Sequence, residues 1–201
     1  MTKIATHKVF SVPIFEFKLN DHIEINKELE KYIYDLMKKD EQGIKVSNQG
    51  GWHSPYFKIN ESKILIKFLE IIRSYLFDII SKEYGWKYDL NKIKIDGMWS
   101  VVNKQNSFNI KHNHPNCFLS AAYYVKVKKN CGKIKFFDPK EQKNIRYPAI
   151  EKFTELSAEV INFHPEEGVL LIFPSYLYHA VDENLSGEDR IVISCNVDIE
   201  K

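Results

Sequence analysis

The sequence is poor in arginine and carries no excess of charge of either sign. Arginine occurs only at Arg73, Arg146 and Arg190, so lysine supplies nearly all of the positive charge. The 29 basic and 27 acidic side chains leave a net charge of +2. Proteins that bind nucleic acids or membrane surfaces usually concentrate one sign of charge on a face, so this balance argues against both classes. Each scarce arginine becomes a candidate for binding a planar anion.

Cysteine is also scarce, and the sequence has no long apolar run. The three cysteines are odd in number and widely spaced, without a Cys-x-x-Cys pair. They predict neither a disulfide framework nor a thiolate metal site, and they are typical of a reducing compartment. The N-terminal residues lack the apolar core of a signal peptide, and no segment reaches the roughly 18 apolar residues that a membrane span requires. We therefore expect a cytoplasmic protein that does not enter a membrane.

The hydrophobic pattern divides the chain into a helical part and a β-rich part. After a short strand-like start, apolar residues recur at helical spacing from Asp21 to Asp40 and from Ser62 to Gly85. From Trp86 onward, short β-type segments alternate with turn residues, which predicts an antiparallel sandwich or jelly-roll barrel. We expect one α+β domain over residues 1–201, with a strand and bracing helices in 1–90 and the β core in 91–201.

The segment "KHNHPN" contains the first candidate for chemistry. His112 and His114 lie two residues apart, directly before Pro115. Alternate side chains of a strand point to the same face, so the two imidazoles converge if this segment is a strand. Proline donates no hydrogen bond to a sheet and would end the strand there, at the mouth of a barrel. Because His-x-His pairs are common by chance, two solvated histidines on a loop are an equal interpretation at this point.

A second candidate segment lies well downstream. An apolar strand breaks at Pro174 and is followed by His179, and Arg190 comes eleven residues later, at the start of "RIVISCNV". A histidine from a separate strand would complete three ligands on one side of a metal and leave other coordination positions open. An arginine deeper in the barrel can bind the far carboxylate of a dicarboxylate whose other end chelates that metal.

Together these segments resemble the Fe(II)- and 2-oxoglutarate-dependent oxygenases, and more narrowly a prolyl-hydroxylase-like group common in marine bacteria and phages. The matching elements cover about residues 99–197: H-x-H-P at 112–115, L-S-A-A-Y-Y-V at 119–125, G-x-I-x-F-x-D-P at 132–139, G-V-L-L-I-F-P-S at 168–175, and His179 followed by R-I-x-I-S-x-N at 190–196. The resemblance implies a double-stranded β-helix, a jelly roll of the cupin type, braced by N-terminal helices.

The resemblance also implies an activity and its metal site. The metal ligands, which are the catalytic residues, would be His112, His114 and His179. The implied enzyme is a dioxygenase that uses Fe(II), 2-oxoglutarate and O2 to hydroxylate a substrate, with release of succinate and CO2. Most of this chemistry belongs to the metal and the cosubstrate, whereas the protein contributes geometry and charge pairing.

Three further positions would bind 2-oxoglutarate. Arg190 would hold the distal carboxylate of the cosubstrate. Tyr124 matches the spacing of the tyrosine that hydrogen-bonds 2-oxoglutarate in prolyl-hydroxylase-like enzymes, and it shares strand parity with His112 and His114. Asn103 and Trp99 lie on the preceding strand and would line the pocket. Aromatic and amide residues at strand spacing are more often core residues than ligands, so these positions also have a purely structural interpretation.

One position departs from the superfamily pattern of His-x-Asp/Glu followed by His. His114 stands where the acidic ligand is expected, and three-histidine sites are also used by zinc hydrolases and lyases. The identity of the metal is therefore less secure than the site. Asp138 and Asp182 are candidates for a carboxylate ligand, although both are explained more simply as turn residues.

Two other classes of function are compatible with the sequence. One is a cupin-like metal enzyme that does not use 2-oxoglutarate, which would have no need of Arg190. The other is a non-catalytic jelly-roll binding or structural module, in which the histidines are incidental. We expect no functional role for His7, His22 and His53 under any of these interpretations.

For an oxygenase, the partner would be a small molecule or a peptidyl residue. The sequence does not determine the oligomeric state, and a homodimer is compatible with it.

Overall fold

The computed structural model describes residues 5, 7–87, 90–140 and 148–200. Within these ranges two antiparallel sheets form the body of the molecule. The strands of the larger sheet are, in spatial order, β1 (Phe15–Lys18), β9 (Val169–Pro174), β6 (Leu119–Lys126), β11 (Arg190–Ile199), β4 (Ile93–Asn103) and β3 (Trp52–His53). Those of the smaller sheet are β2 (Asn48–Gln49), β5 (Phe108–His112), β10 (His179–Val181), β7 (Ile134–Phe137) and β8 (Val160–Phe163). This is the jelly roll that the segment pattern predicts, so the expected fold class is confirmed.

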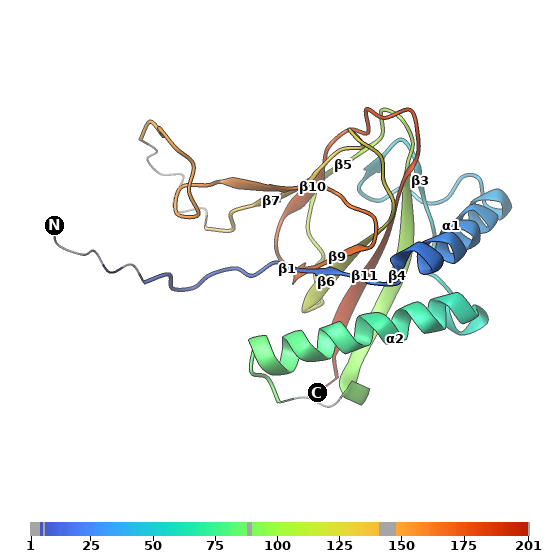
Figure 1. Ribbon diagram of the computed structural model, residues 1–201, viewed down its shortest axis with the longest axis horizontal. Helices are drawn as coiled ribbons and strands as arrows, with labels where there is room; N and C mark the ends of the chain where they lie inside the picture. The colour runs from blue at the N-terminus through green and yellow to red at the C-terminus, as the bar shows by residue number, and fades with distance from the viewer. Residues whose placement is uncertain (1–4, 6, 88–89, 141–147, 201) are drawn as a thin grey trace.

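Two helices lie against the outer face of the larger sheet (Figure 1). They are α1 (His22–Lys39) and α2 (Lys63–Asp78), and a π-helical turn, Ile79–Glu83, extends α2. Short 3-10 helices occur at Ile59–Glu61 and Leu90–Lys92. The apolar stripes of α1 and α2 bury Leu29, Ile33, Phe68 and Ile72 against the sheet. Both predicted helices are therefore confirmed, and their helical spacing is explained by burial of one face.

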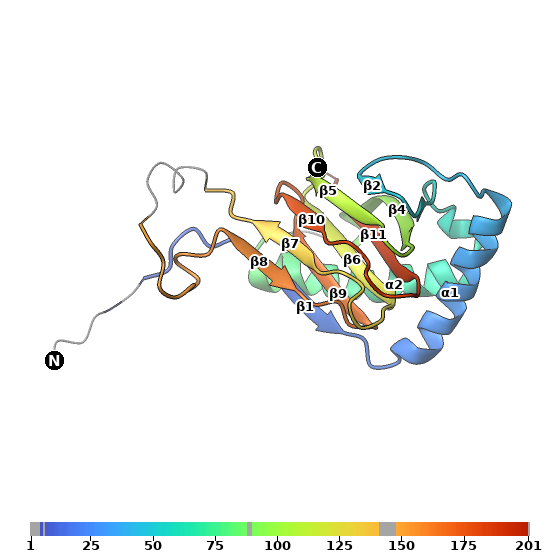
Figure 2. The same cartoon turned by 90° about the horizontal axis from the view of Figure 1, so that it is seen from above.

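Alternation along β6 separates the two faces of the larger sheet. Tyr123 belongs to the apolar cluster beneath the helices, whereas its neighbours Ala122 and Tyr124 belong to a second cluster between the sheets. Phe136 from β7 and Phe173 from β9 contribute to that second cluster, with their ring centroids 4.8 Å apart. The interior of the jelly roll is therefore apolar on the side of β7 and β9, and Figure 2 shows these strands lying over one another.

The segment between α1 and α2 contains strands that the sequence pattern does not reveal. β2 and β3 are two residues each and lie in the polar stretch "SNQGGWH", between the two predicted helices, where no strand is predicted. They pair with β5 and β4, respectively. Strands this short carry no readable alternation, so only tertiary pairing defines them.

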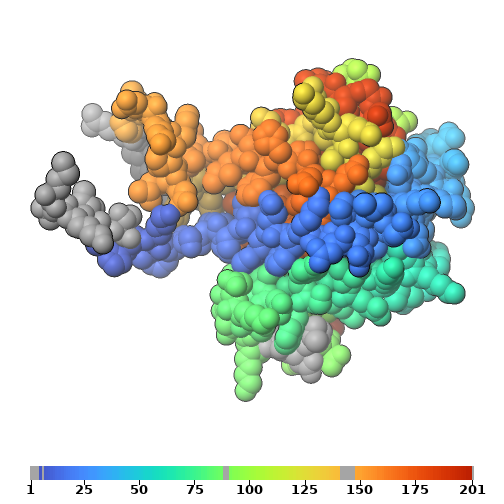
Figure 3. Space-filling view, viewed as in Figure 1, coloured from blue at the N-terminus to red at the C-terminus, as the bar shows by residue number. Residues whose placement is uncertain are grey.

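Residues 7–14, before β1, run away from the barrel beside residues 148–159, before β8 (Figures 1 and 2). Lys8 and Glu155 form an ion pair between these two segments. In Figure 3 the N-terminal segment lies between the orange strands and helix α2. No helix within the described ranges is both long and apolar enough to cross a membrane.

Candidate metal centre

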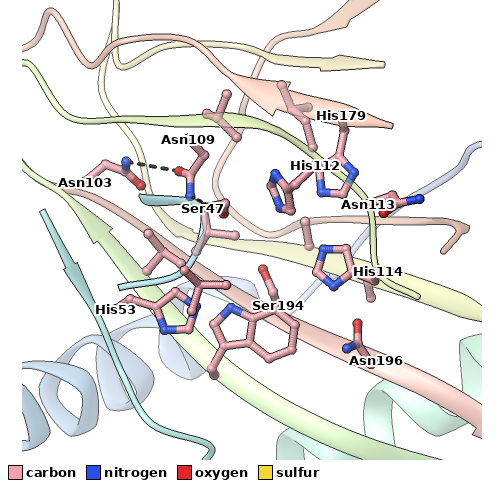
Figure 4. A pocket seen from close by; sticks show the side chains of 18 of the residues that line it. Ser47, His53, Asn103, Asn109, His112, Asn113, His114, His179, Ser194 and Asn196 are labelled. Atoms are coloured by element: carbon pink, nitrogen blue, oxygen red, sulfur yellow. Dashed lines mark hydrogen bonds between the residues drawn. The ribbon is translucent and has the colours of Figure 1, made fainter. Parts of the chain in front are cut away.

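Three histidine side chains converge between the two sheets (Figure 4). One ring nitrogen of His112, of His114 and of His179 can be chosen so that all three atoms lie within 4.8 Å of one another. The ring centroids of His112 and His179 are 4.3 Å apart, and those of His114 and His179 are 5.1 Å apart. Three imidazole nitrogens at this separation can share one metal ion. The structure thus brings together the three residues that the sequence singles out.

Two of the three rings are fixed by strand pairing and by main-chain hydrogen bonds. His112 ends β5, and its directly opposed partner in the antiparallel pair with β10 is His179. The Nδ1 atom of His112 is 2.7 Å from the carbonyl oxygen of Ile110, and Nδ1 of His179 is 3.0 Å from that of Leu177. A neutral imidazole that donates from Nδ1 keeps its lone pair on Nε2, which is the usual arrangement for a metal ligand.

His114 is held differently, and here the prediction that it shares a strand with His112 is wrong. Strand β5 ends at His112, and the main-chain N–H of His114 donates to the carbonyl oxygen of Ser175, 2.9 Å away, in the turn after β9. The ring of His114 is therefore presented by a loop, and its convergence with His112 results from tertiary contacts instead of strand alternation.

Burial keeps the three rings neutral at physiological pH. It lowers the pKa of His114 to about 4 and that of His179 to about 3, and it also lowers the pKa of His112. His112 also disfavours protonation of His114 and His179, and His114 disfavours that of His179, since like charges repel at this distance. Neutral imidazoles have free lone pairs, so the cluster suits a transition-metal cation.

The histidines line a cavity of about 410 Å³, and Arg190 lines the same cavity. Arg190 is 1% exposed, and its Nη1 donates to the carbonyl oxygens of Cys131 (2.8 Å) and Gly132 (3.3 Å). Its Nε has no hydrogen-bond partner among the described residues. The charge of Asp182 raises the pKa of Arg190, but the ion pair that Asp182 forms is with Lys135, at 2.5 Å. A buried guanidinium with unused donors fits a carboxylate from a ligand.

The other predicted pocket residues also line this cavity, namely Trp99, Asn103 and Tyr124. Burial raises the pKa of the Tyr124 hydroxyl, and the positive charge of the nearby Arg190 partly opposes this shift. Asn103 is the strand partner of Arg190, and its Nδ2 donates to Oδ1 of Asn109 at 3.3 Å (Figure 4). The side chain of Asn103 is thus partly engaged in a network that continues from Asn109 to Ser47.

Several residues of the cavity wall are not expected from the sequence, and His53 is the histidine among them. His53, from β3, is buried, lines the cavity and stacks on Trp99 with a centroid distance of 5.8 Å and an interplanar angle of 12°. Its polar sequence neighbourhood gives no signal for this position, because only the pairing of His53 with Val101 in β4 brings it to the site. The sequence predicts no role for His53 and gives no indication that this residue lies in the cavity wall.

The candidate carboxylate ligands do not join the cluster. Among the described residues, the group that could hold a metal contains neither Asp138 nor Asp182. Oδ1 of Asp138 accepts from the main-chain N–H of Lys140, which is the turn role suggested by its position before Pro139. The metal-ligand set offered by this part of the chain therefore consists of three imidazoles.

The family model described as "Putative 2OG-Fe(II) oxygenase" matches residues 97–196, which include all three histidines and Arg190. The chain belongs to the 2OG-Fe(II) oxygenase family. The cofactors of this oxygenase are accordingly Fe(II) and 2-oxoglutarate, with O2 as the oxidant. No curated protein matches the chain.

Solved structures with the same fold include several prolyl hydroxylases. A Pseudomonas putida prolyl-4-hydroxylase superposes with a TM-score of 0.69 at 11% identity, over 95% of this chain and 95% of that chain. A viral collagen prolyl hydroxylase from Paramecium bursaria Chlorella virus-1, in its 2OG complex, gives 0.57 at 13% identity, over 92% and 94%. A prolyl hydroxylase bound to a hypoxia-inducible-factor peptide from Trichoplax adhaerens gives 0.64 at 13% identity, over 92% and 83%. At this identity the likeness establishes the double-stranded β-helix fold of the oxygenase.

Proposed function

We propose that His112, His114 and His179 are the iron ligands of this oxygenase and that the chain hydroxylates a substrate at this centre. The observation that carries the proposal is the convergence of three neutral ring nitrogens within 4.8 Å in a cavity that also contains an arginine. The donor set fits Fe(II), because imidazole is a suitable ligand for that ion. Bound Fe(II) with 2-oxoglutarate and O2 supplies oxidative decarboxylation to succinate and CO2, coupled to hydroxylation of the substrate.

We further propose that Arg190 binds the distal carboxylate of 2-oxoglutarate and that Tyr124 and Asn103 border the same subsite. The unpaired Nε of Arg190 and its burial support this assignment, since a buried guanidinium without an anion is costly. Its Nη1 is anchored to two main-chain carbonyls, so the guanidinium is oriented before the cosubstrate arrives. The chain thus orients the cosubstrate and keeps its charged end away from water.

The substrate would enter the cavity as an uncharged group of a small molecule or a peptide. Among the described residues that line the cavity, Arg190 is the one with a full charge, and the remainder are apolar, aromatic, amide, hydroxyl or neutral imidazole groups. A charged group would lose its hydration there without gaining a partner. The cysteines of the chain are free, and we propose a cytoplasmic location on that basis.

Anaerobic reconstitution tests the centre directly. Purified protein without a histidine tag is loaded with Fe(II), 2-oxoglutarate is added, and the weak visible charge-transfer band and later succinate formation are measured. We expect one equivalent of iron, a band that needs both additions, and succinate formation without added substrate. His179→Ala should abolish iron binding, whereas His164→Ala, which removes an exposed histidine, should not. Stoichiometric zinc with no response to 2-oxoglutarate would instead indicate a three-histidine enzyme of another class.

Arg190→Ala tests the cosubstrate subsite. We expect it to weaken 2-oxoglutarate binding by about 2–5 kcal/mol, because the carboxylate would be buried without its partner. Iron content should be unchanged, since Arg190 is not part of the histidine cluster. Arg190→Lys keeps the charge but loses the planar fork, so an intermediate affinity is expected. An Arg190→Ala enzyme with the wild-type 2-oxoglutarate titration would remove Arg190 from this role.

A further inference from the structure

Residues 7–14 and 148–159 form an arm that extends beyond the two sheets (Figures 1 and 2). Lys8 and Glu155 pair across the arm, but no main-chain hydrogen bond of residues 7–14 occurs among the described residues. Large apolar side chains along the arm are exposed, namely Val9 (62%), Phe10 (87%), Phe153 (72%) and Leu156 (63%). Because the arm leads away from the body of its own chain, these side chains stay in water unless another molecule covers them.

The strand that follows the arm is an unprotected sheet edge. Strand β8 is the last strand of the smaller sheet, and within the described ranges it pairs with β7 alone. Edge strands usually carry a lysine, a proline or a bulge, which prevents pairing with other chains. β8 reads Val-Ile-Asn-Phe and has no charged residue or proline. Val160 and Ile161 are both exposed, although neighbouring residues of a strand face opposite sides. The edge is therefore suited to pairing with a further strand.

The area and charge of this surface fit a second copy of the chain. The two phenylalanines alone expose roughly 300 Å². The aliphatic residues of the arm and of β8 add a comparable area, so each copy approaches the roughly 800 Å² per partner of a standard interface. Two lysines and three glutamates in the arm leave it nearly neutral. Two such surfaces do not repel each other, whereas a nucleic acid or a membrane surface would require an excess of positive charge.

Two-fold symmetry supplies the matching edge. A two-fold axis perpendicular to a sheet sets a strand beside its own copy in antiparallel orientation, so the edge of β8 is complementary to itself. The arm precedes β8 directly and projects past the edge of its own sheet (Figure 2). In such a pair each arm would reach over the other copy, where its exposed aromatic rings can be buried.

We propose that the chain forms a two-fold homodimer in which the β8 strands pair and each arm packs on the partner copy. The two smaller sheets then join edge to edge. The dimer buries Phe10 and Phe153 as its apolar anchors. The proposal does not rest on the proposed function, and its test requires neither metal nor 2-oxoglutarate.

Sedimentation velocity of the full-length chain over a range of concentrations tests the proposal. We expect a species of twice the chain mass of 23.7 kDa. Phe10→Asp and Phe153→Asp should each raise the dissociation constant of the dimer at least about 30-fold, which is the usual effect of removing an aromatic anchor from an interface. A chain that stays monomeric up to about 100 μM overturns the proposal, since an interface of this size holds at lower concentrations. A mass above that of a dimer overturns the closed two-fold arrangement.

A matched control separates this surface from exposed apolar residues elsewhere. Ile23 on α1 is 71% exposed and lies outside the arm, so Ile23→Asp should leave the dissociation constant unchanged. All three substituted positions are exposed, and circular dichroism checks that each variant keeps the wild-type fold. A dimer that tolerates both arm substitutions, or that Ile23→Asp disrupts equally, overturns the assignment of the interface to the arm.

Disulfide cross-linking tests the pairing of β8 separately. In a Cys117→Ser background, which removes the one native cysteine that is not buried, a cysteine is introduced at Val160, Ile161 or Asn162. Residues near a two-fold axis lie beside their own copies, so oxidation should join two chains through at least one of these positions. Ile23→Cys should give no cross-link. A dimer that forms no cross-link from any position of β8 overturns the strand pairing.

Discussion

At the scale of single residues, the histidine cluster carries no negative charge, because His114 stands where the superfamily pattern has an acidic residue. Three neutral imidazoles leave the charge of a divalent metal uncompensated by the protein, and Arg190 adds a further positive charge to the same cavity. The pocket is therefore electrostatically incomplete without an anion. A dianionic cosubstrate that bound in the proposed way, with one carboxylate on the metal and the other on Arg190, would offset two of these three positive charges.

Gly132 controls the position of Arg190. Its φ is +89°, and a Cβ at this position would lie 2.2 Å from the carbonyl oxygen of Asp182 and 2.9 Å from Nη1 of Arg190. Gly132→Ala should lower the free energy of unfolding by about 1–3 kcal/mol and raise the 2-oxoglutarate concentration required, because the guanidinium is displaced. Urea unfolding and a 2-oxoglutarate titration measure the two effects. Gly187→Ala, where a Cβ meets nothing within 4 Å, is the control and should change neither.

At the scale of elements, the outer helices support the site through the sheet between them. Helix α1 contacts β6, the strand that presents Tyr124 to the cavity. One residue earlier, Oη of Tyr123 donates to Oδ1 of Asn26 on α1 at 2.6 Å, and Nδ2 of that asparagine has no partner among the described residues. This buried pair joins the helix to the strand that carries Tyr124 on its cavity face.

Removing the Tyr123 hydroxyl tests that connection. Tyr123→Phe should lower the free energy of unfolding by about 1–3 kcal/mol, because the amide of Asn26 would be buried with no partner at all. Adding Asn26→Leu to this variant should restore part of the loss, since both polar partners are then absent. Tyr176→Phe, at a half-exposed tyrosine, is the control. Urea unfolding followed by circular dichroism measures all four proteins, and an unaffected Tyr123→Phe would show that the bond contributes nothing net.

At the scale of the whole molecule, the centre connects the two sheets. His112 and His179 come from the smaller sheet and Arg190 from the larger one, while His114 follows the smaller sheet on a loop. A ligand that contacts all of them binds the folded state and not the unfolded chain. Metal and cosubstrate should therefore stabilise the fold, and each should increase the affinity of the other.

Thermal unfolding measures this linkage. With Co(II) at about 100 times its dissociation constant, we expect about 2.7 kcal/mol of added stability, a rise of roughly 5–10 °C for a chain of this size. Adding 2-oxoglutarate should raise the midpoint further only when metal is present, and EDTA should reverse both effects. His179→Ala should show neither rise. Equal stabilisation by 2-oxoglutarate with and without metal would contradict the shared site.

The sequence by itself determined the class of fold and the chemistry of the centre. Helical spacing before Trp86 and short strands after it carry enough information for a braced jelly roll, because one-sided burial imposes a period on each element. The order of H-x-H-P, a later histidine and Arg190 indicated a metal–dicarboxylate site, since those residue types have few other uses in that order.

Only the tertiary structure decided how the centre is assembled. Strands β2 and β3 are too short to carry a pattern, so His53 reached the cavity wall solely through pairing with β4. His114 lies beyond the end of β5, because its main-chain N–H donates to Ser175 in the turn after β9. Local sequence patterns report which face of an element is buried, whereas contacts between distant segments depend on how the sheets pair and close.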